Sequence, residues 1–190
     1  MKTTVVIPNY NGKHFLQDCL DSLLQSTVEI AVIVVDNGST DGSVSWIQEH
    51  FPQVKLICFS ENKGFCTAVN TGIEAAATPY VFLLNNDTKT DRFCLERLER
   101  AMEADEKIFS VGAKMLSMKE PELVDTAGDL YSAFGWAYAI GKGRLSSNYT
   151  APKRVFSNCA GAALYRKAHL EQIGGFDELH FAYLEDVDIG

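Results

Sequence analysis

The first half of the chain repeats one pattern, in which a short apolar run is followed by polar or small residues and then by an amphipathic segment. The apolar runs have the length of strands, and the amphipathic segments carry apolar residues at helical spacing. We therefore expect strands at 4–7, 30–35, 54–59 and 81–84, and helices over 15–24, 44–50, 68–77 and 93–104. Strands that are apolar on both faces and alternate with helices predict an α/β fold, with a mostly parallel sheet flanked by helices on both faces.

The pattern changes after about residue 110. A further strand is expected at 110–115, whereas 125–144 is rich in glycine and aromatic residues and predicts a small antiparallel excursion. Residues 158–163 are mostly small, which would let a ligand or another backbone come close. A short helix over 168–173 is expected to end at Gly174.

The ends of the predicted strands are the first place to look for a site. In open α/β sheets, ligands bind outside the carboxyl ends of the strands, near the point where the strand order reverses. Polar and small residues follow the four strands of the first half at these ends. They are residues 8–11, 36–39, 61–64 and 85–87.

Composition narrows the class of protein. The chain has 190 residues, of which 46% are hydrophobic, so it can build one core, and its length favours one domain or at most one plus a partial second. Its net charge of −8 disfavours a nucleic-acid binder, because phosphate neutralisation needs a basic face. No apolar run approaches the roughly 20 residues of a membrane span. The five cysteines contain no CxxC pair, so neither a zinc site nor a redox motif is expected.

Three residues at the predicted strand ends could bind a ligand, and each has a plain structural alternative. Asp87 follows two asparagines, and such oxygens suit a hard cation, although the same run makes a turn and a helix cap. Asp36 ends an apolar strand and could accept from a ligand, or it could cap the next turn. Lys63 could sit near a phosphate, or it could be a surface lysine in a tight turn.

A second acidic cluster lies at residues 185–188, close to Phe181 and Tyr183. A carboxylate in a partly apolar setting has a raised pKa and can act as a base. The alternative is a solvated helix start, where the helix dipole favours carboxylates. Several other chemistries are excluded, because the sequence has no GxGxxG after its first strand, no Walker A motif, no GxSxG and no HExxH.

Taken together, the motifs of this chain resemble those of family 2 glycosyltransferases, and most closely a rhamnosyltransferase-like branch that builds bacterial surface polysaccharides. The resemblance covers essentially the whole chain. Six motifs occur in the family's order, namely residues 5–12, 34–42, 62–65 with Asn70, 83–88, 174–178 and 183–188. It implies a GT-A fold, which is Rossmann-like, and an inverting transfer from a nucleotide-diphospho-sugar, assisted by Mg²⁺ or Mn²⁺.

The resemblance also implies roles for residues on the donor side. Asp87 matches the metal ligand of the family's DxD-like motif, whose first acidic position is here Asn85. The residues that would bind a UDP- or dTDP-sugar are Pro8, Tyr10, Asn11, Asp36, Lys63, Gly64 and Asn86.

On the acceptor side, the resemblance implies that Asp186 is the general base. Gly161, Ala162 and Glu185 would border the acceptor, which would be a saccharide or a lipid-linked saccharide. The expected location is the cytoplasm, and a lipid-linked acceptor would bring the protein to the inner face of the membrane as a peripheral protein.

The same resemblance implies a domain organisation. We expect one GT-A domain over 1–190, with a nucleotide-sugar half at 1–115 and an acceptor-side half at 116–190. Family members continue past the Glu-Asp motif, so the second half is expected to be incomplete. The alternative function is a nucleotide-sugar-binding module without catalysis, or an inactive fragment of such an enzyme. A sugar-nucleotide nucleotidyltransferase is disfavoured, because the glycine-rich, Arg/Lys-bearing loop after the first strand is absent.

Overall fold

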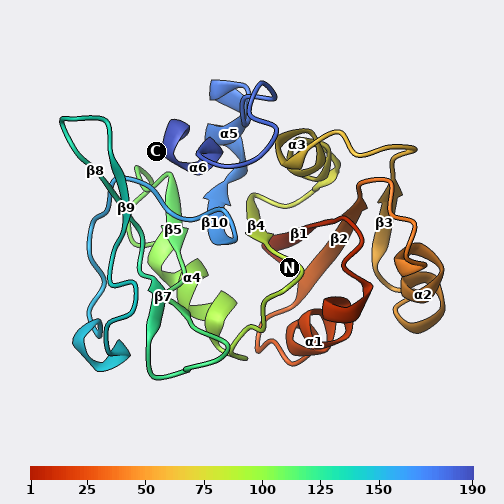
Figure 1. The fold of residues 1–190 in the computed structure, drawn as a ribbon, viewed down its shortest axis with the longest axis horizontal. Helices are drawn as coiled ribbons and strands as arrows, with labels where there is room; N and C mark the ends of the chain where they lie inside the picture. Colours follow the sequence, from red (N-terminus) through yellow and green to blue (C-terminus); the bar gives the residue numbers. More distant parts are fainter.

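A computed structural model describes residues 1–190 and contains one large sheet and two small ones (Figure 1). The large sheet has the strand order β3-β2-β1-β4-β10-β5. Its first four strands are mutually parallel, whereas β10 runs antiparallel to both of its neighbours. The bounds are β1 Thr3–Asn9, β2 Ile30–Asp36, β3 Lys55–Cys58, β4 Tyr80–Leu84, β10 Ala162–Arg166 and β5 Ser110–Gly112. The predicted mostly parallel sheet is therefore confirmed.

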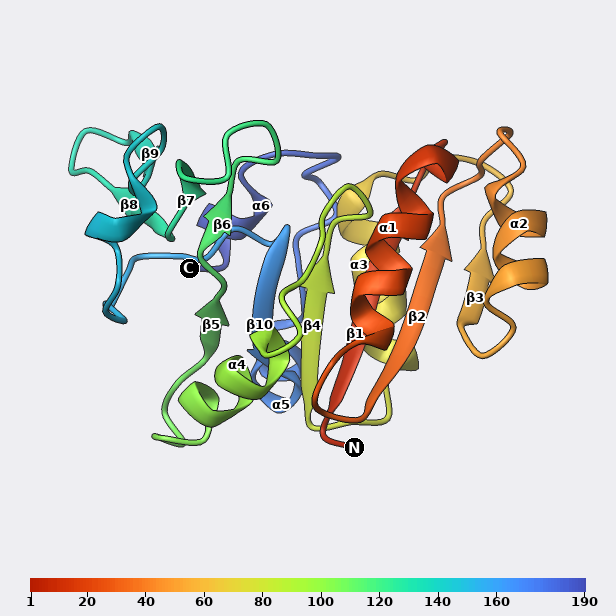
Figure 2. The same ribbon diagram turned by 90° about the horizontal axis from the view of Figure 1, so that it is seen from below.

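Helices cover both faces of the large sheet, as Figures 1 and 2 show from two directions. Buried side chains of α1, α2 and α4 pack on one face, and those of α3 and α5 pack on the other. The last helix, α6, is a single short turn near the end of the chain. The bounds are α1 Lys13–Leu24, α2 Ser43–His50, α3 Phe65–Ala75, α4 Cys94–Met102, α5 Lys167–Ile173 and α6 Glu185–Asp188.

The core consists of two apolar layers separated by the sheet. One cluster has 17 buried residues and the other has 15. Side chains of β1 alternate between them, so that Val5 and Ile7 lie in the first cluster and Val6 lies in the second. Each layer also contains one fully buried cysteine, Cys19 in the first and Cys66 in the second.

Most predicted elements are confirmed within a few residues, but the strand expected at 110–115 is wrong. The chain forms β5 over Ser110–Gly112 and then leaves the large sheet, and Met115–Leu116 forms β6 in a separate sheet with β7, Val124–Thr126. The last bond to the large sheet runs from the Ala113 amide to the carbonyl oxygen of Ala162, at 2.9 Å. The apolar run thus serves two sheets, which its periodicity cannot reveal.

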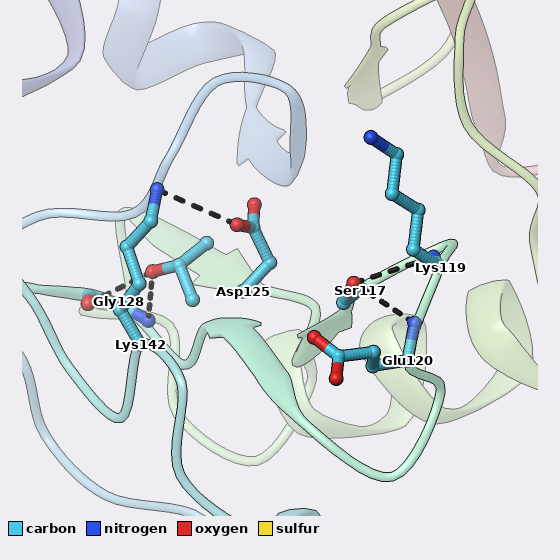
Figure 3. Close-up of polar contacts among 7 residues, drawn as sticks. Ser117, Lys119, Glu120, Asp125, Gly128 and Lys142 are labelled. Carbon is cyan, nitrogen blue, oxygen red and sulfur yellow. Dashed lines mark hydrogen bonds and ion pairs between the residues drawn. The ribbon is translucent and has the colours of Figure 1, made fainter.

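The predicted antiparallel excursion is present. It contains the β6–β7 pair, a β8–β9 hairpin formed by Asp129–Tyr131 and Ala137–Ala139, and a short 3-10 turn, η1, at Ser146–Asn148. Figure 3 shows the local contacts that hold it, including the Lys142–Asp125 ion pair at 3.5 Å. In the turn after β6, the Ser117 hydroxyl accepts hydrogen bonds from the amides of Lys119 and Glu120. None of the helices in the chain is both long enough and apolar enough to span a bilayer.

Candidate functional site

A cavity of about 310 Å³ opens at the carboxyl ends of β1 and β4. This is the switch point of the sheet, because β1 pairs with β2 on one side and with β4 on the other. The strand-end loops selected from the sequence meet here, together with a segment from the end of the chain. The lining residues are Pro8, Asn9, Tyr10, Asn37, Asn62, Gly64, Phe65, Asn85, Asn86, Asp87, Phe181 and Ala182.

Asn9 organises the base of the cavity. Its side-chain amide donates to the Asp36 carboxylate at 2.8 Å, and its side-chain oxygen accepts from Asn86 at 2.7 Å. The same amide also lies 3.1 Å from the Ser43 hydroxyl. Because these partners end β2, follow β4 and begin α2, Asn9 at the end of β1 fixes the relative positions of the strand ends.

Asp36 lies beneath the cavity and is only 1% exposed. One carboxylate oxygen accepts from the Ser39 amide at 2.9 Å, and the other accepts from Asn9 and from Ser43. The carboxylate thus caps the following turn, which was the structural alternative for this residue. A buried carboxylate with this many donors orders the loop over residues 37–39.

Asn37 ties the loop after β3, residues 61–64, to the loop after β2, residues 36–39. The Asn37 side chain donates to the Gly64 carbonyl at 2.9 Å and accepts from the Lys63 amide at 2.8 Å. Lys63 contributes only its backbone to this contact. Its ammonium lies 5.0 Å from the centre of the Phe59 ring, and the residue does not line the cavity.

Tyr10 lies at the cavity on the β1 side, and Asn11 follows it in the loop. Tyr10 is half exposed and lines the cavity, so its ring is free to contact a ligand. Asn11 has a φ of +50°, and its side chain accepts from the Thr40 amide at 2.8 Å instead of facing the cavity. Asn11 therefore shapes the loop that carries Tyr10.

Asp87 is the one carboxylate among the lining residues. It is exposed in the turn after β4, and Asn85 and Asn86 supply amide groups beside it. No three His, Cys, Asp or Glu side chains lie close enough to hold a metal ion by themselves. One carboxylate with amide oxygens nevertheless fits Mg²⁺, which proteins commonly hold through one or two carboxylates plus substrate phosphates.

The segment 176–182 crosses the loop after β3, residues 61–64, and closes one side of the cavity. The Asn70 side chain exchanges two hydrogen bonds with the Phe176 backbone, at 2.8 and 2.9 Å. The Phe65 amide donates to the Phe181 carbonyl at 2.8 Å. Gly64 has a φ of +88°, and a Cβ there would lie 2.8 Å from that carbonyl oxygen. Only glycine fits at this crossing.

Asp186 and Glu185 begin α6, and neither of them lines the cavity. An Asp186 oxygen accepts from the Ala160 amide at 3.3 Å. Glu185 is buried, one of its oxygens has no partner, and burial raises the pKa of its carboxyl. Gly161 connects the two regions, because its carbonyl accepts from the Asn85 amide at 2.9 Å. Ala162 is buried in the core at the start of β10.

A further carboxylate, Asp129 of β8, lies near Asp186. Burial, followed by the Asp186 charge, raises the pKa of Asp129 to about 6. The backbone of Asp129 pairs with that of Ser157 in an isolated antiparallel bridge. One Asp129 oxygen and the Ser157 hydroxyl are buried without hydrogen-bond partners.

The sequence predictions missed several of these residues. Asn9, Asn37 and Asn62 lie inside the strand-end segments that had been selected, so their positions were a usable signal. Phe181 was noted only as an apolar neighbour of the acidic cluster. Asp129 had no signal, because a single carboxylate within an aromatic-rich hairpin resembles a surface residue.

Comparisons with known proteins identify the family and the fold of the chain. Residues 4–174 match the sequence profile of Glycosyl transferase family 2. The N-acetylglucosaminyl-diphospho-decaprenol L-rhamnosyltransferase of Mycobacterium tuberculosis is 26% identical over 212 residues, which cover 98% of this chain and 68% of that protein.

Solved structures share the fold. Staphylococcus aureus TarS 1-349 in complex with UDP superposes with a TM-score of 0.72 at 19% identity, over 100% of this chain and 54% of TarS 1-349. The mannosyltransferase PcManGT of Pyrobaculum calidifontis, in complex with GDP-Man and Mn²⁺, gives a TM-score of 0.69 at 19% identity, over 99% of this chain and 50% of PcManGT. The chain thus spans about half the length of these structures, and the expected GT-A fold is confirmed. Because the profile match extends over most of its length, the chain belongs to glycosyl transferase family 2.

Proposed function

We propose that this chain is the catalytic domain of an inverting glycosyltransferase. It would move a sugar from a nucleotide-diphospho-sugar to a hydroxyl of a saccharide or lipid-linked saccharide in the synthesis of a bacterial surface polysaccharide. The observation that carries the proposal is the cavity at the sheet's switch point, which is lined by amide side chains and one carboxylate. The UDP complex of TarS and the activity named for the mycobacterial relative support it.

The nucleotide would bind across the ends of β1 and β2. Tyr10 is the exposed ring that can contact the base, with Pro8 beside it. Amide groups both donate and accept, so the asparagines can satisfy a base and a ribose. Asp36 and Asn11 would act by holding the loops that face the nucleotide, since their oxygens already accept bonds from the protein. Lys63 would reach a phosphate only by leaving the Phe59 ring.

Asp87, with Asn86 beside it, would hold the divalent cation at the diphosphate end of the cavity. When bound, Mg²⁺ or Mn²⁺ offsets the negative charge that develops on the leaving diphosphate. GDP-Man and Mn²⁺ occur together in the complex of PcManGT, which supports this assignment. Asn85 bonds to Gly161 through its backbone, so the cation loop and the acceptor side are joined directly.

Asp186 would be the general base, and its proton transfer can be followed atom by atom. The acceptor oxygen forms a bond to the anomeric carbon while its proton passes to an Asp186 oxygen. The bond from that carbon to the diphosphate oxygen breaks, and the diphosphate leaves with the electron pair. Attack and departure on opposite faces invert the anomeric carbon. A positioned base of this kind contributes about 10²–10⁴-fold to the rate.

Donor binding should depend on a divalent cation and on Asp87. We expect calorimetry with UDP, dTDP and GDP to show binding that is at least about ten-fold tighter with Mn²⁺ than without it, since the phosphates and the carboxylate share the ion. The Asp87→Ala variant should lose this difference. Asp105→Ala, which removes an exposed carboxylate elsewhere, is the matched control and should keep it. Equal affinity with and without Mn²⁺ in the unmodified chain would overturn the metal assignment.

The role of Asp186 is separable from donor binding. We expect Asp186→Asn to keep the nucleotide affinity of the unmodified chain and to lower the hydrolysis of nucleotide-sugar, with water as acceptor, by about 10²–10⁴-fold. Product nucleotide measured over time reports the rate. Unchanged hydrolysis would exclude Asp186 as the base. Binding without any hydrolysis in the unmodified chain would favour the non-catalytic module instead.

A further inference from the structure

The β8–β9 hairpin, residues 129–139, carries four exposed aromatic side chains. Phe134 is 90% exposed, Trp136 is 65% exposed and Tyr138 is 54% exposed. The hairpin lies at the end of the molecule opposite β3 and α2 in both Figure 1 and Figure 2. Isolated exposed apolar residues are ordinary, but a cluster on one projecting element marks an interaction surface.

The backbone of the hairpin fixes this surface in an ordered shape. At the tip, the Ser132 amide donates to the Trp136 carbonyl at 2.9 Å, and Gly135 has a φ of +82°. Leu130 and Tyr138 pair directly across the two strands, and both are exposed. Polar residues are the usual occupants of such a tip, and a two-stranded hairpin gains no fold stability from an exposed Phe.

The charge around the hairpin is opposite to that of the whole chain. The chain has a net charge of −8, yet residues 129–170 contain six Lys and Arg against a single acidic residue, Asp129. Four of these bases are exposed and belong to the segments that continue from the hairpin. Lys142 pairs with Asp125, whereas Arg144, Lys153 and Arg154 form no ion pair. Lys153 and Arg154 lead to Phe156, whose ring stacks on Tyr131 of the hairpin at 5.2 Å.

We propose that the hairpin and its flanking bases dock the protein on an anionic lipid surface. Aromatic rings settle at the headgroup level of a bilayer, and Lys and Arg beside them are attracted to anionic headgroups. A protein partner fits less well, because lysine is depleted from protein interfaces and a stable interface needs about 800 Å² on each side, more than one small hairpin offers. The occupant that matches both features is therefore a membrane.

The position of the hairpin gives the docking a purpose. Asp129, its first residue, pairs through its backbone with Ser157, and three residues further along the same segment the Ala160 amide donates to an Asp186 oxygen at 3.3 Å. A docked hairpin would therefore present the acceptor side to the lipid headgroups. This last step rests on the proposed function, whereas the docking itself does not, because it can be measured without donor or acceptor.

Vesicle sedimentation of the 190-residue chain tests the proposal. We expect the chain to sediment with vesicles of phosphatidylcholine and phosphatidylglycerol, but not with phosphatidylcholine alone, and to be released by salt. The double variant Phe134→Ser/Trp136→Ser should weaken binding by at least about ten-fold. Lys153→Gln/Arg154→Gln should weaken it by about five-fold for each charge removed.

Matched controls separate docking from general stickiness. Leu24→Ser/Ile173→Ser removes two exposed apolar side chains at other helices, and Arg100→Gln/Lys107→Gln removes two exposed bases near α4. Both controls should bind as the unmodified chain does. Equal weakening by the controls and by the hairpin variants would overturn the proposal, as would the absence of sedimentation with anionic vesicles.

A spectroscopic measurement needs no change to the hairpin. The chain has two tryptophans, and Trp46→Phe leaves Trp136 as the single reporter. We expect its fluorescence to shift to the blue when anionic vesicles are added, because the ring moves from water into the headgroup region. An unchanged spectrum would contradict the docking even if the chain sediments. Concentration-dependent dimerisation through the hairpin, without vesicle binding, would assign the surface to a second copy instead.

Discussion

At the scale of single residues, the region around Asp186 differs from the cavity at the strand ends in how its polar atoms are satisfied. Asn9, Asp36 and Asn37 hold one another in a connected network. Near Asp186, in contrast, single polar atoms of Asp129, Ser157 and Glu185 are buried without partners. Buried polar atoms without partners are costly, and they accumulate where a protein awaits a ligand that can donate. Sugar hydroxyl groups are such donors.

Asp129 should make stability depend on pH. Its folded-state pKa is raised from 3.8 to about 6, so its favourable contribution is complete below about pH 4 and is lost as the pH rises through 6. This pKa shift can change the free energy of unfolding by at most about 3 kcal/mol. Because Asp129 is partly exposed, we expect a change of about 1–2 kcal/mol. We expect Asp129→Asn to be more stable than the unmodified chain by that amount above about pH 7 and to lose the advantage near pH 4.

Urea unfolding at both pH values measures the effect. Glu106→Gln, which removes an exposed carboxylate that makes no side-chain hydrogen bond or ion pair, is the control for the loss of one negative charge. An Asp129→Asn advantage that is the same at both pH values would show that the stabilisation does not come from the titration of this carboxyl.

At the scale of elements, the packing of α3 on the sheet depends on one small residue. Gly72 lies in the middle of α3, and a Cβ at this position would lie 2.2 Å from a methyl carbon of Val6. The helix therefore approaches β1 more closely than a helix with a side chain there could. Gly64 precedes the first residue of α3, and Asn70 lies within the helix. The close approach therefore also sets the position of the loop 61–64 and of the segment 176–182 that crosses it.

Replacing Gly72 by Ala should destabilise the fold, although alanine is the better helix former. The helix preference favours alanine by about 1 kcal/mol. Overpacking typically costs about 1–3 kcal/mol, so we expect a net loss of up to about 2 kcal/mol in the free energy of unfolding. Adding Val6→Ala should recover part of this loss through a favourable coupling in a double-mutant cycle. Additive effects of the two substitutions would contradict the close contact.

At the scale of the whole molecule, the two halves of the sequence share one sheet. β10 comes from the second half and lies between β4 and β5 of the first half, with backbone pairing on both sides. Asn70 adds a second connection through Phe176. We propose that residues 1–115 and 116–190 form one folding unit. The first half would supply the donor side of the site and the second half the acceptor side.

The fragment 1–115 should therefore not fold alone. Without β10, the edges of β4 and β5 keep unpaired backbone groups, and exposed edges of this kind promote aggregation. We expect the fragment to elute from a sizing column as aggregates and to show no cooperative transition in urea, whereas the whole chain shows one. A monomeric fragment with a cooperative transition would contradict a single folding unit.

Much of the fold was predictable because the relevant signals are local. The run at 30–35 is apolar and β-branched, so it forms β2, and the apolar residues at helical spacing in 15–24 form α1. The loops at the cavity, which follow β1, β2, β3 and β4, were predictable for a related reason. They follow parallel strands, and such strands end at one edge of the sheet.

The rest depends on contacts between residues that are distant in the sequence. Nothing near Phe181 indicates that its carbonyl will meet Phe65, and the partner of Asp129 is Ser157, in the segment that returns to the large sheet. The division of 110–115 between β5 and β6 has the same origin, since it follows from where β10 pairs. The local pattern of apolar and polar residues cannot predict these contacts, because they depend on how distant segments pack in the folded chain.

The two buried cysteines offer a way to follow each layer of the molecule separately. Cys19 and Cys66 lie on opposite faces of the sheet, and burial raises their thiol pKa values to about 12 and about 11. A thiol reagent therefore reaches either sulfur only when the covering helix opens. The labelling rate of Cys19 then reports the opening of α1, and that of Cys66 reports the opening of α3. Comparing the two rates with and without nucleotide would show which layer loosens first and which one the donor holds in place.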